Sequence, residues 1–303
     1  MRILVTGASG LLGLNLCLHL AEVHRVFGAL HSQKLIDPPF QTLVSDLSND
    51  RSLESLLKKS RPDLLIHCAA MANVDACESH PEEAHRINAD MPGNLADLCK
   101  KKGIRFIHIS TDAVFDGKMG DYSEEDTPNP LSIYARTKLE GEHLVAAEYS
   151  CAIIARVNFY GYSLSGKRSL SEFFLNNLKS GKSVNGFVDV MFCPLYVTDL
   201  VDTLMAMVVK ELEGLYHVVS PESLSKYAFG VKIAEKFGLD KNLIQPKSVT
   251  EGGLLAARSP RLTLKIDKLK EAEITPPGQS ECLEHFQTHY VEKLPEKIKA
   301  FAG

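Results

Sequence analysis

A tyrosine and a lysine stand four residues apart near the middle of the chain, at Tyr134 and Lys138. The pattern around them predicts a helix that runs to about Tyr149, and residues four apart on a helix lie on one face. A lysine so placed stabilises a phenolate, so we expect the pKa of Tyr134 to fall from its ordinary value of about 10. Such a tyrosine can exchange a proton with a substrate oxygen.

A hydroxyl that would orient the same oxygen comes earlier, in the segment Ser110-Thr111-Asp112. This segment ends a strand predicted over residues 105–110, and open α/β sheets bind their ligands at the carboxyl ends of strands. Thr111 is therefore a third candidate catalytic residue, and Asp112 is a candidate substrate-binding residue. A Y-x-x-x-K pair alone is common by chance, so it indicates a catalytic site only together with the elements around it.

The N-terminal segment supplies the most specific of these elements. Residues 2–6 are an apolar, β-branched run that predicts a buried strand, and a glycine-rich turn and a helical pattern follow at once. This order is typical of a dinucleotide-binding βαβ unit, because the glycines admit a pyrophosphate and the helix presents free N–H groups to it. The cofactor-binding candidates in the turn are Gly7, Ser9, Gly10, Leu11, Leu12 and Gly13.

The end of the second predicted strand, residues 25–30, bears on the choice of cofactor. Folds that prefer NAD place a carboxylate there, which accepts hydrogen bonds from the ribose hydroxyls and would repel a 2′-phosphate. This chain has His31, Ser32 and Lys34 at that place and no acid. The pattern favours NADP(H) over NAD(H), with His31 as a candidate cofactor-binding residue.

Two further strand ends complete the predicted cofactor site. A third strand at residues 43–45 is followed by an aspartate that can accept a hydrogen bond from the adenine amine. A fourth strand at residues 63–68 runs into two alanines, which let the backbone pass close under the ribose and nicotinamide. Tight packing of strand on helix would select the same small residues. The candidates from these two strand ends are Asp46, Leu47, Cys68, Ala69 and Ala70.

Strands and helices alternate from the N-terminus to Ser110, and a sixth strand is predicted at residues 151–157. Because this is the alternation of βαβ units, we predict an α/β fold with a doubly wound parallel sheet of Rossmann type. The strict alternation ends near Gly161, which indicates a smaller C-terminal α/β substrate-binding domain. The predicted boundaries are 1–157 for the NAD(P)-binding domain, with a return segment at about 190–220, and 158–189 with 221–303 for the substrate-binding region.

Composition argues against several classes of function. The chain has 303 residues and a formal net charge of −4, which gives no electrostatic reason to bind nucleic acid or an anionic membrane. Its seven cysteines include no C-x-x-C pair, which argues against a disulfide framework and a thiolate metal site. Without a signal peptide pattern or an apolar run near the ~20 residues that span a bilayer, we expect a cytoplasmic protein that holds no metal.

Over essentially its full length, the chain resembles the extended short-chain dehydrogenase/reductase superfamily, and within it the dTDP-4-dehydrorhamnose reductase branch. The residues that carry the resemblance are Gly7 to Gly13, His67-Cys68-Ala69-Ala70, Ser110 to Gly117, Tyr122, Glu125, Pro130, Tyr134, Lys138 and Glu142. The resemblance implies that Tyr134 is the general acid, that Lys138 binds the nicotinamide ribose and tunes Tyr134, and that Thr111 contacts the substrate carbonyl.

The same resemblance places Asn88 and Asn158 near the nicotinamide end of the cofactor. We assign Asn88 to the cofactor and Asn158 to the substrate. It also implies a nucleotide-sugar substrate and a homodimer. In sugar-nucleotide enzymes of this superfamily the C-terminal region supplies groups for the nucleotide diphosphate, and Arg258 and Arg261 could donate charge-assisted hydrogen bonds there. Surface arginines in a loop are an equally good interpretation.

Three departures from the pattern of that branch fall on the substrate side. Ala113 stands where the branch usually has a tyrosine, and His67 where it usually has an asparagine. The segment 192–195, Phe-Cys-Pro-Leu, lacks the glycine and the threonine that usually flank its proline. The resemblance therefore implies the cofactor and the proton donor more directly than it implies rhamnose.

Three hypotheses follow. The first is an NADPH-dependent reductase of the keto group of a nucleotide-activated deoxysugar, with a hydride from the nicotinamide and a proton from Tyr134. The second is a sugar-nucleotide epimerase or dehydratase that holds NAD tightly and uses the same Tyr-Lys pair. The third is non-catalytic, because the regulatory β subunit of methionine adenosyltransferase has a similar Gly-Leu-Leu-Gly turn and His-Cys-Ala-Ala strand end. Such a subunit would bind NADP(H) and a partner enzyme without turnover.

Overall fold

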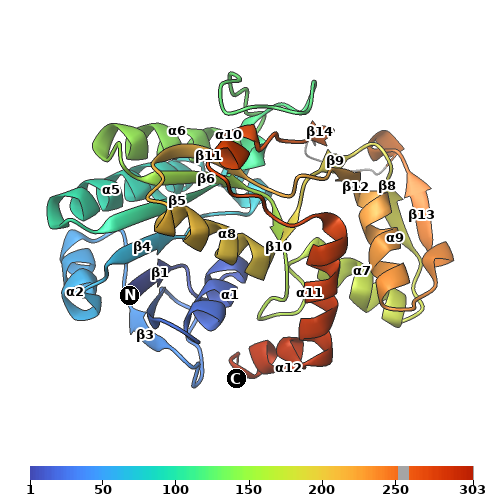
Figure 1. Cartoon of the computed structure of the whole chain (residues 1–303), viewed down its shortest axis with the longest axis horizontal. Coiled ribbons are helices and arrows are strands. Elements are labelled where there is room, and N and C mark those ends of the chain that lie inside the picture. Colours follow the sequence, from blue (N-terminus) through green and yellow to red (C-terminus); the bar gives the residue numbers. More distant parts are fainter. Residues whose placement is uncertain (252–258, 303) are drawn as a thin grey trace.

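A computed structural model describes residues 1–251 and 259–302. Within these residues, a parallel sheet is covered by helices on both faces, and short strands and further helices gather beyond one end of it (Figure 1). The sheet has seven strands in the spatial order β11 (Gly214–Val218), β6 (Ile153–Val157), β5 (Arg105–Thr111), β4 (Leu64–His67), β1 (Arg2–Thr6), β2 (Arg25–Leu30) and β3 (Gln41–Val44).

The central strands are short apolar runs that are buried along almost their whole length, as expected where helices cover both faces of a parallel sheet. The strand order reverses between β1 and β4, which confirms the predicted doubly wound sheet. At such a reversal the connections leave in opposite directions and open a crevice at the carboxyl ends of the strands. Thr6, His67 and Thr111 end three neighbouring strands at this edge.

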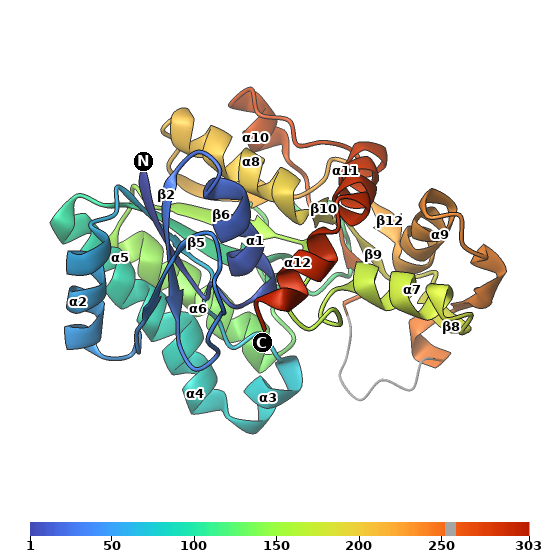
Figure 2. The same ribbon diagram turned by 90° about the horizontal axis from the view of Figure 1, so that it is seen from below.

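Two hydrophobic cores lie on the two faces of the sheet. Apolar side chains of α1 and α8 belong to one core, and those of α2, α5 and the end of α6 belong to the other. Figure 2 shows α1 and α8 on one side of the strands and α5 and α6 on the other. The bounds of these helices are α1 (Leu11–Leu20), α2 (Asp50–Ser60), α5 (Met91–Lys102), α6 (Ile133–Glu148) and α8 (Val197–Val209).

The connection from β4 to α5 consists of short helical segments. A short helix that the sequence did not indicate, α3 (Val74–Ser79), comes first, and the Asn73 side chain caps it by accepting a hydrogen bond from Ala76 N at 3.0 Å. α4 (Pro81–His85) then passes through a π-helical turn at Arg86–Asp90 directly into α5. The widened turn comes directly before Met91 and Pro92, and the helix continues through them without an interruption.

The chain beyond β6 builds a second group of elements from small sheets of two or three strands. Their strands are β7 (Phe159–Tyr160) with β10 (Leu195–Tyr196), β9 (Met191–Phe192) between β12 (Leu224–Ser225) and β14 (Arg261–Leu262), and β8 (Val184–Phe187) with β13 (Ile244–Lys247). Their helices are α7 (Leu170–Lys179), α9 (Lys226–Lys236), α10 (Asp267–Glu271), α11 (Gln279–Val291) and α12 (Leu294–Ala300).

The two groups of elements are joined by more than the chain itself. β11 leaves the second group and returns to the central sheet, where it pairs with β6 in parallel. Near the C-terminus, the carbonyl of Phe301 accepts a hydrogen bond from Ile36 N, in the loop after β2, at 3.0 Å. No helix among the described residues is both long enough and apolar enough to cross a membrane.

Candidate active site

The helix α6 is fixed at its N-terminus by two side chains. Ser132 caps it by accepting a hydrogen bond from Ala135 N at 3.2 Å, and Glu78 of α3 accepts one from Ile133 N at 2.7 Å. Satisfying these otherwise free N–H groups stabilises the first turn. Tyr134 lies in that turn and Lys138 one turn further along, so the predicted helix and the predicted shared face are both present.

Tyr134, Thr111 and Asp112 meet at the carboxyl end of β5. The Thr111 hydroxyl is close enough to the Tyr134 phenol to lower its pKa, as a hydrogen-bond donor does. Thr111 lies 3.1 Å from Asp112 Oδ1, and Asn158 Nδ2 donates to Asp112 Oδ2 at 2.5 Å. Asp112 is buried, and this burial raises the pKa of its carboxyl to about 6. The structure therefore brings together the predicted proton donor, the predicted orienting hydroxyl and two of the predicted substrate residues.

The prediction that Lys138 lowers the pKa of Tyr134 is wrong in this structure. Burial raises the pKa of Tyr134 to about 12, and the charge of Asp112 raises it further, while the hydrogen bond with Thr111 opposes them. The physical reason is the direction of the amine, because Lys138 Nζ donates to the Ile109 carbonyl at 2.7 Å and lies 3.3 Å from His108 Nε2. Tyr134 is consequently a protonated phenol at neutral pH.

Lys138 is itself buried, and burial lowers its pKa to about 8 against the opposing charge of Glu142. Glu142 lies one turn beyond Lys138 and pairs with Arg156 of β6, whose Nη2 donates to Glu142 Oε2 at 2.7 Å. Ser110 Oγ donates to the other carboxylate oxygen of Glu142 at 2.5 Å. Because Arg156 and Ser110 hold this buried carboxylate, it fixes the inner face of α6 against β5 and β6.

Eight of the predicted cofactor residues line one cavity of about 300 Å³, at the glycine turn and the carboxyl ends of β2 and β4. Gly7 and Gly13 are required for this shape. Gly7 has a φ of +67°, and a Cβ on Gly13 would lie 2.2 Å from the Gly7 carbonyl oxygen. The predicted residues that line the cavity are Gly7, Ser9, Gly10, His31, Leu47, Cys68, Ala69 and Ala70.

The donor groups of this cavity fit a dinucleotide phosphate. Gly10 is the N-cap of α1, and no described side chain caps this helix, so the first N–H groups of α1 are left for a ligand. Ser32, Gln33 and Arg168 line the same cavity as His31. Arg168 precedes α7 in the second group of elements, and it is exposed. It therefore adds a cation to the lining of this cavity.

The other predicted cofactor residues lie outside this lining. Leu11, Leu12 and Gly13 form the first turn of α1. Asp46 is exposed, and hydrogen bonds from Ser48 lower its pKa. Asn88 is buried in the π-helical turn, where its carboxamide bonds the backbone of Met71 and donates to Thr137 Oγ1 at 3.1 Å. Asn88 thus holds the segment after β4 against α6.

The two predicted arginines have different outcomes. Arg258 lies outside the described residues. Arg261 begins β14, and its backbone N–H donates to the carbonyl of Gly117 at 3.0 Å. Because Gly117 belongs to the loop that follows Asp112, this contact brings β14 beside the substrate side of the site. The side chain of Arg261 is exposed there.

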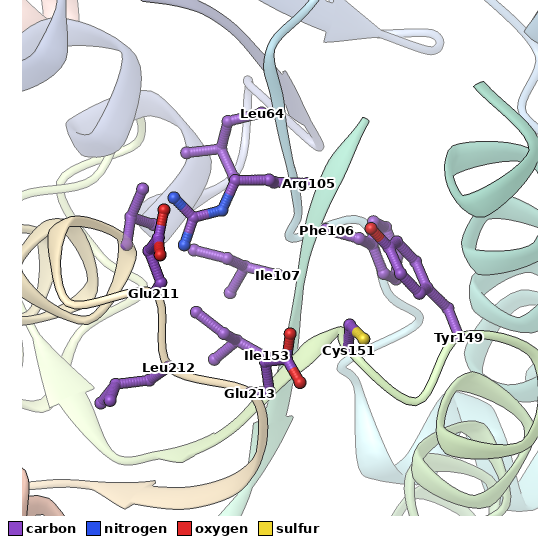
Figure 3. Close-up of a pocket in the computed structure, with 11 residues that line it drawn as sticks. Leu64, Arg105, Phe106, Ile107, Tyr149, Cys151, Ile153, Glu211, Leu212 and Glu213 are labelled. Carbon is purple, nitrogen blue, oxygen red and sulfur yellow. The ribbon is translucent and has the colours of Figure 1, made fainter. Parts of the chain in front are cut away.

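A cavity of about 270 Å³ lies at the opposite edge of the sheet (Figure 3). It is lined by Leu64, Arg105 and Ile153, near the amino ends of β4, β5 and β6, and by the segment Glu211–Glu213. None of the predicted site residues lines it, and parallel sheets of this kind bind their ligands at the carboxyl ends. Across residues 1–251 and 259–302, no cluster of three or more His, Cys, Asp or Glu side chains is arranged to hold a metal ion.

Sequence reasoning missed three side chains that shape the site, Glu78, His108 and Arg168. Each acts across a large gap in sequence, so no local motif indicates it. His108 lay in the middle of the predicted fifth strand, three residues before Thr111, and a histidine within that apolar strand was the one available signal. Glu78 and Arg168 belong to a helix start and a loop whose places in space depend on the tertiary fold.

Comparisons with known proteins agree with this geometry. The sequence profile of the RmlD substrate binding domain matches residues 1–291. The chain is 35% identical to the probable low-salt glycan biosynthesis reductase Agl14 of Haloferax volcanii, over 89% of this chain and 91% of that protein. It is 30% identical to the methionine adenosyltransferase 2 subunit beta of Bos taurus, over 86% of this chain and 78% of that protein.

Among solved structures, the chain is similar to a dTDP-4-dehydrorhamnose reductase of Bacillus anthracis that was crystallised in complex with NADP. The TM-score is 0.81 at 27% identity, and the match covers 96% of this chain and 99% of the other. The similarity therefore spans the central sheet and the second group of elements together.

Proposed function

The chain belongs to the RmlD substrate binding domain family, within the extended short-chain dehydrogenase/reductase superfamily of nicotinamide-dependent oxidoreductases, and we propose that it reduces the keto group of a nucleotide-activated deoxysugar with NADPH. The observation that carries the proposal is the contact of Tyr134 with Thr111 at the carboxyl end of β5, at the same edge of the sheet as the glycine-lined cavity. Both named reductases to which the chain is similar support this class of reaction.

The chain's own residues supply the proton and hold the substrate. A bound nicotinamide supplies the hydride for the carbonyl carbon. Tyr134 donates its phenolic proton to the carbonyl oxygen as negative charge develops there, and Thr111 orients that oxygen by a hydrogen bond. A pKa of about 12 keeps the Tyr134 phenol protonated at neutral pH, which suits a proton donor in the direction of reduction. We assign Lys138 to the nicotinamide ribose, because its amine is directed to the Ile109 carbonyl and not to the Tyr134 phenol.

The preference for NADP(H) over NAD(H) is part of the proposal. The turn after β2 carries no acid, and His31 and Ser32 line the cavity together with Arg168. A guanidinium binds a phosphate through two parallel hydrogen bonds, which a ribose hydroxyl cannot match. We assign the 2′-phosphate to this group of side chains.

Replacement of Arg168 by Gln tests the assignment. We expect the affinity for NADPH to fall about tenfold, as the loss of one charge-assisted hydrogen bond predicts, and the affinity for NADH to stay within about twofold. Fluorescence titration of both cofactors measures the two affinities. Lys167→Gln is the matched control, because Lys167 is the neighbouring exposed cation and does not line the cavity. An equal loss of affinity for NADPH and NADH would show that Arg168 binds a part that both cofactors share, and not the 2′-phosphate.

The substrate side supports a sugar other than the rhamnose precursor. Ala113 follows Asp112 directly and has no hydroxyl, and Cys193 is buried where the charge of Asp112 acts on its thiol. We assign the sugar to Asp112 and Asn158, and the nucleotide diphosphate to Arg258 and Arg261. Which sugar fits is a question for a substrate panel.

The deciding experiment is oxidation of NADPH by the purified protein against a panel of nucleotide 4-keto-6-deoxysugars. In Tyr134→Phe we expect turnover to fall by ~10² to 10⁴ because the proton donor is lost, with NADPH affinity kept within about twofold. Tyr149→Phe, which removes a hydroxyl just beyond the other end of α6, is the control and should leave turnover unchanged. Turnover of Tyr134→Phe within about tenfold of the wild-type value would overturn the role of Tyr134.

The similarity to the methionine adenosyltransferase subunit supports a second candidate function, a non-catalytic NADP(H)-binding subunit. It predicts NADPH binding without turnover of any member of the panel. An epimerase or dehydratase would instead be purified with NAD held in place. These outcomes separate the three hypotheses without assuming one of them.

A further inference from the structure

Lys138 is buried in the described structure, with 3% of its surface exposed. Its ammonium has three protons to donate. One goes to the Ile109 carbonyl at 2.7 Å, and His108 Nε2 lies within reach of a second at 3.3 Å. One proton is thus left for the active-site side.

The protonation of His108 follows from these contacts. His108 is fully buried, and burial together with the charge of Lys138 holds its pKa well below the ordinary value, so the imidazole is neutral. Because an ammonium only donates, His108 Nε2 must accept, and the single ring proton lies on Nδ1. Within the described part of the chain, that nitrogen has no hydrogen-bond partner.

A second buried imidazole stacks on the first. The rings of His67 and His108 lie 5.7 Å apart at an interplanar angle of 20°. Thr6 Oγ1 accepts hydrogen bonds from the N–H groups of Cys68 and Ala69, at 3.2 and 3.3 Å, so its own proton points to His67 Nδ1 at 2.8 Å. The proton of His67 is therefore on Nε2, which also has no partner among the described residues.

Leaving two N–H groups buried and unpaired opposes folding, and an apolar residue at either strand position would avoid that cost. A histidine at either position is therefore favourable only if it makes a contact that an apolar residue cannot make. For His108, the contact that an apolar residue could not replace is the acceptor that it offers to Lys138.

We propose that His108 is a positioning residue for Lys138, whose ammonium it holds together with the Ile109 carbonyl so that one ammonium proton faces the ligand. The inference rests on the proposed role of Lys138 in the active site. His108 acts only through Lys138 and is not itself a catalytic residue.

The inference predicts a change in the titration of Lys138. Burial lowers the pKa of this lysine to about 8, while the charge of Glu142 raises it, and the neutral rings of His108 and His67 complete its surroundings. An acceptor stabilises the charged amine. Its removal should therefore lower the pKa of Lys138 further.

We would measure this pKa directly, from the ¹³Cε resonance of Lys138 in protein labelled at lysine, assigned by its absence in Lys138→Met. In His108→Phe we expect the pKa to fall by at least about one unit, a tenfold loss of proton affinity. His108→Gln places an amide oxygen near the Nε2 position and should restore the wild-type value. His108→Asn ends at the Nδ1 position and should remain shifted, so it carries the same test if His108→Phe does not fold.

His67→Asn is the matched control. It removes the neighbouring buried ring but keeps an acceptor for the Thr6 hydroxyl, so the Lys138 titration should not move. An unchanged titration in both His108→Phe and His108→Asn would overturn the proposal. So would an equal shift in His67→Asn, because the effect would then belong to packing.

The measurement needs no substrate, which keeps it separate from the proposed function. In the pH profile of turnover, the alkaline limb should move to lower pH in His108→Phe. In His108→Gln it should return to its wild-type position. A shifted resonance with no turnover on any substrate would leave the positioning role in place and overturn the reductase.

Discussion

At the scale of single residues, identity and electrostatic behaviour were predictable to different degrees. The sequence indicated Tyr134, Lys138 and Thr111 from residue type and spacing, and the structure brings Tyr134 into contact with Thr111. It did not indicate the pKa of Tyr134, because that depends on which way the Lys138 amine points. The direction is set by the backbone of Ile109 and by His108, on a strand with no sequence relation to the helix.

Asp112 leads to a prediction about stability. Its pKa rises from the ordinary 3.8 to about 6 in the folded protein, so between these values the folded state binds the proton more tightly than the unfolded state. This group therefore favours folding at low pH, and its contribution is lost as the pH rises through 6. Asp112→Asn removes the ionisation. Its stability relative to wild type should improve between pH 4.5 and pH 7, by at most about 3 kcal/mol.

Urea denaturation at pH 4.5, 5.5 and 7 measures the difference. Asp126→Asn is the control, because the pKa of Asp126 is shifted in the opposite direction. Hydrogen bonds from Ser123 hold it below its ordinary value. Its ionisation changes below the tested range, so its difference from wild type should be flat. A flat difference for Asp112→Asn as well would show that the Asp112 carboxyl titrates normally.

At the scale of elements, the glycine turn is the part that sequence predicted best. The reason is steric. A turn that places Gly13 against the backbone of Gly7 leaves no room for a side chain, so glycine is required there and the sequence shows it. The π-helical turn at Arg86–Asp90 was not predictable in the same way. A widened turn leaves helical periodicity nearly intact, and here Asn88 within it bonds the segment after β4 and α6.

Gly13→Ala tests the steric argument. The new Cβ would lie 2.2 Å from the oxygen and 2.8 Å from the carbon of the Gly7 carbonyl, which are backbone atoms that cannot turn aside. We expect a loss of ~1–3 kcal/mol in stability and of measurable NADPH binding, because α1 must move away from the turn.

Gly93→Ala is the comparison for this variant. Gly93 is also helical, but its Cβ would meet only the Leu144 side chain, at 3.0 Å. The usual helical gain of up to ~1 kcal/mol for alanine partly offsets that contact. Thermal unfolding and NADPH titration compare the two variants. Equal effects would show that the turn tolerates a side chain.

At the scale of the whole molecule, the regular half of the fold was predictable and the irregular half was not. β1, β2, β4, β5 and β6 are mostly apolar, buried runs at βαβ spacing. This pattern identifies the sheet even where single strand ends shift, as at β3 and at the start of β6. Most described strands of the second group, such as β9 and β14, have only two residues. Runs that short carry no periodicity, and their pairing depends on contacts between distant segments. The domain boundaries and the homodimer remain predictions.

The return of β11 to the sheet has a consequence for how the chain is made. During synthesis, β6 is complete at Val157, yet its neighbour β11 begins only at Gly214. Until then a nascent chain carries an open strand edge at β6, with unpaired backbone groups. Arg156, which pairs with Glu142, lies on this edge strand. A chain that stops at Val157 should therefore aggregate when expressed, whereas one that continues through Val218 should stay in the supernatant. Sedimentation of the two truncated chains compares them, and equal recovery would mean that the first six strands tolerate their open edge.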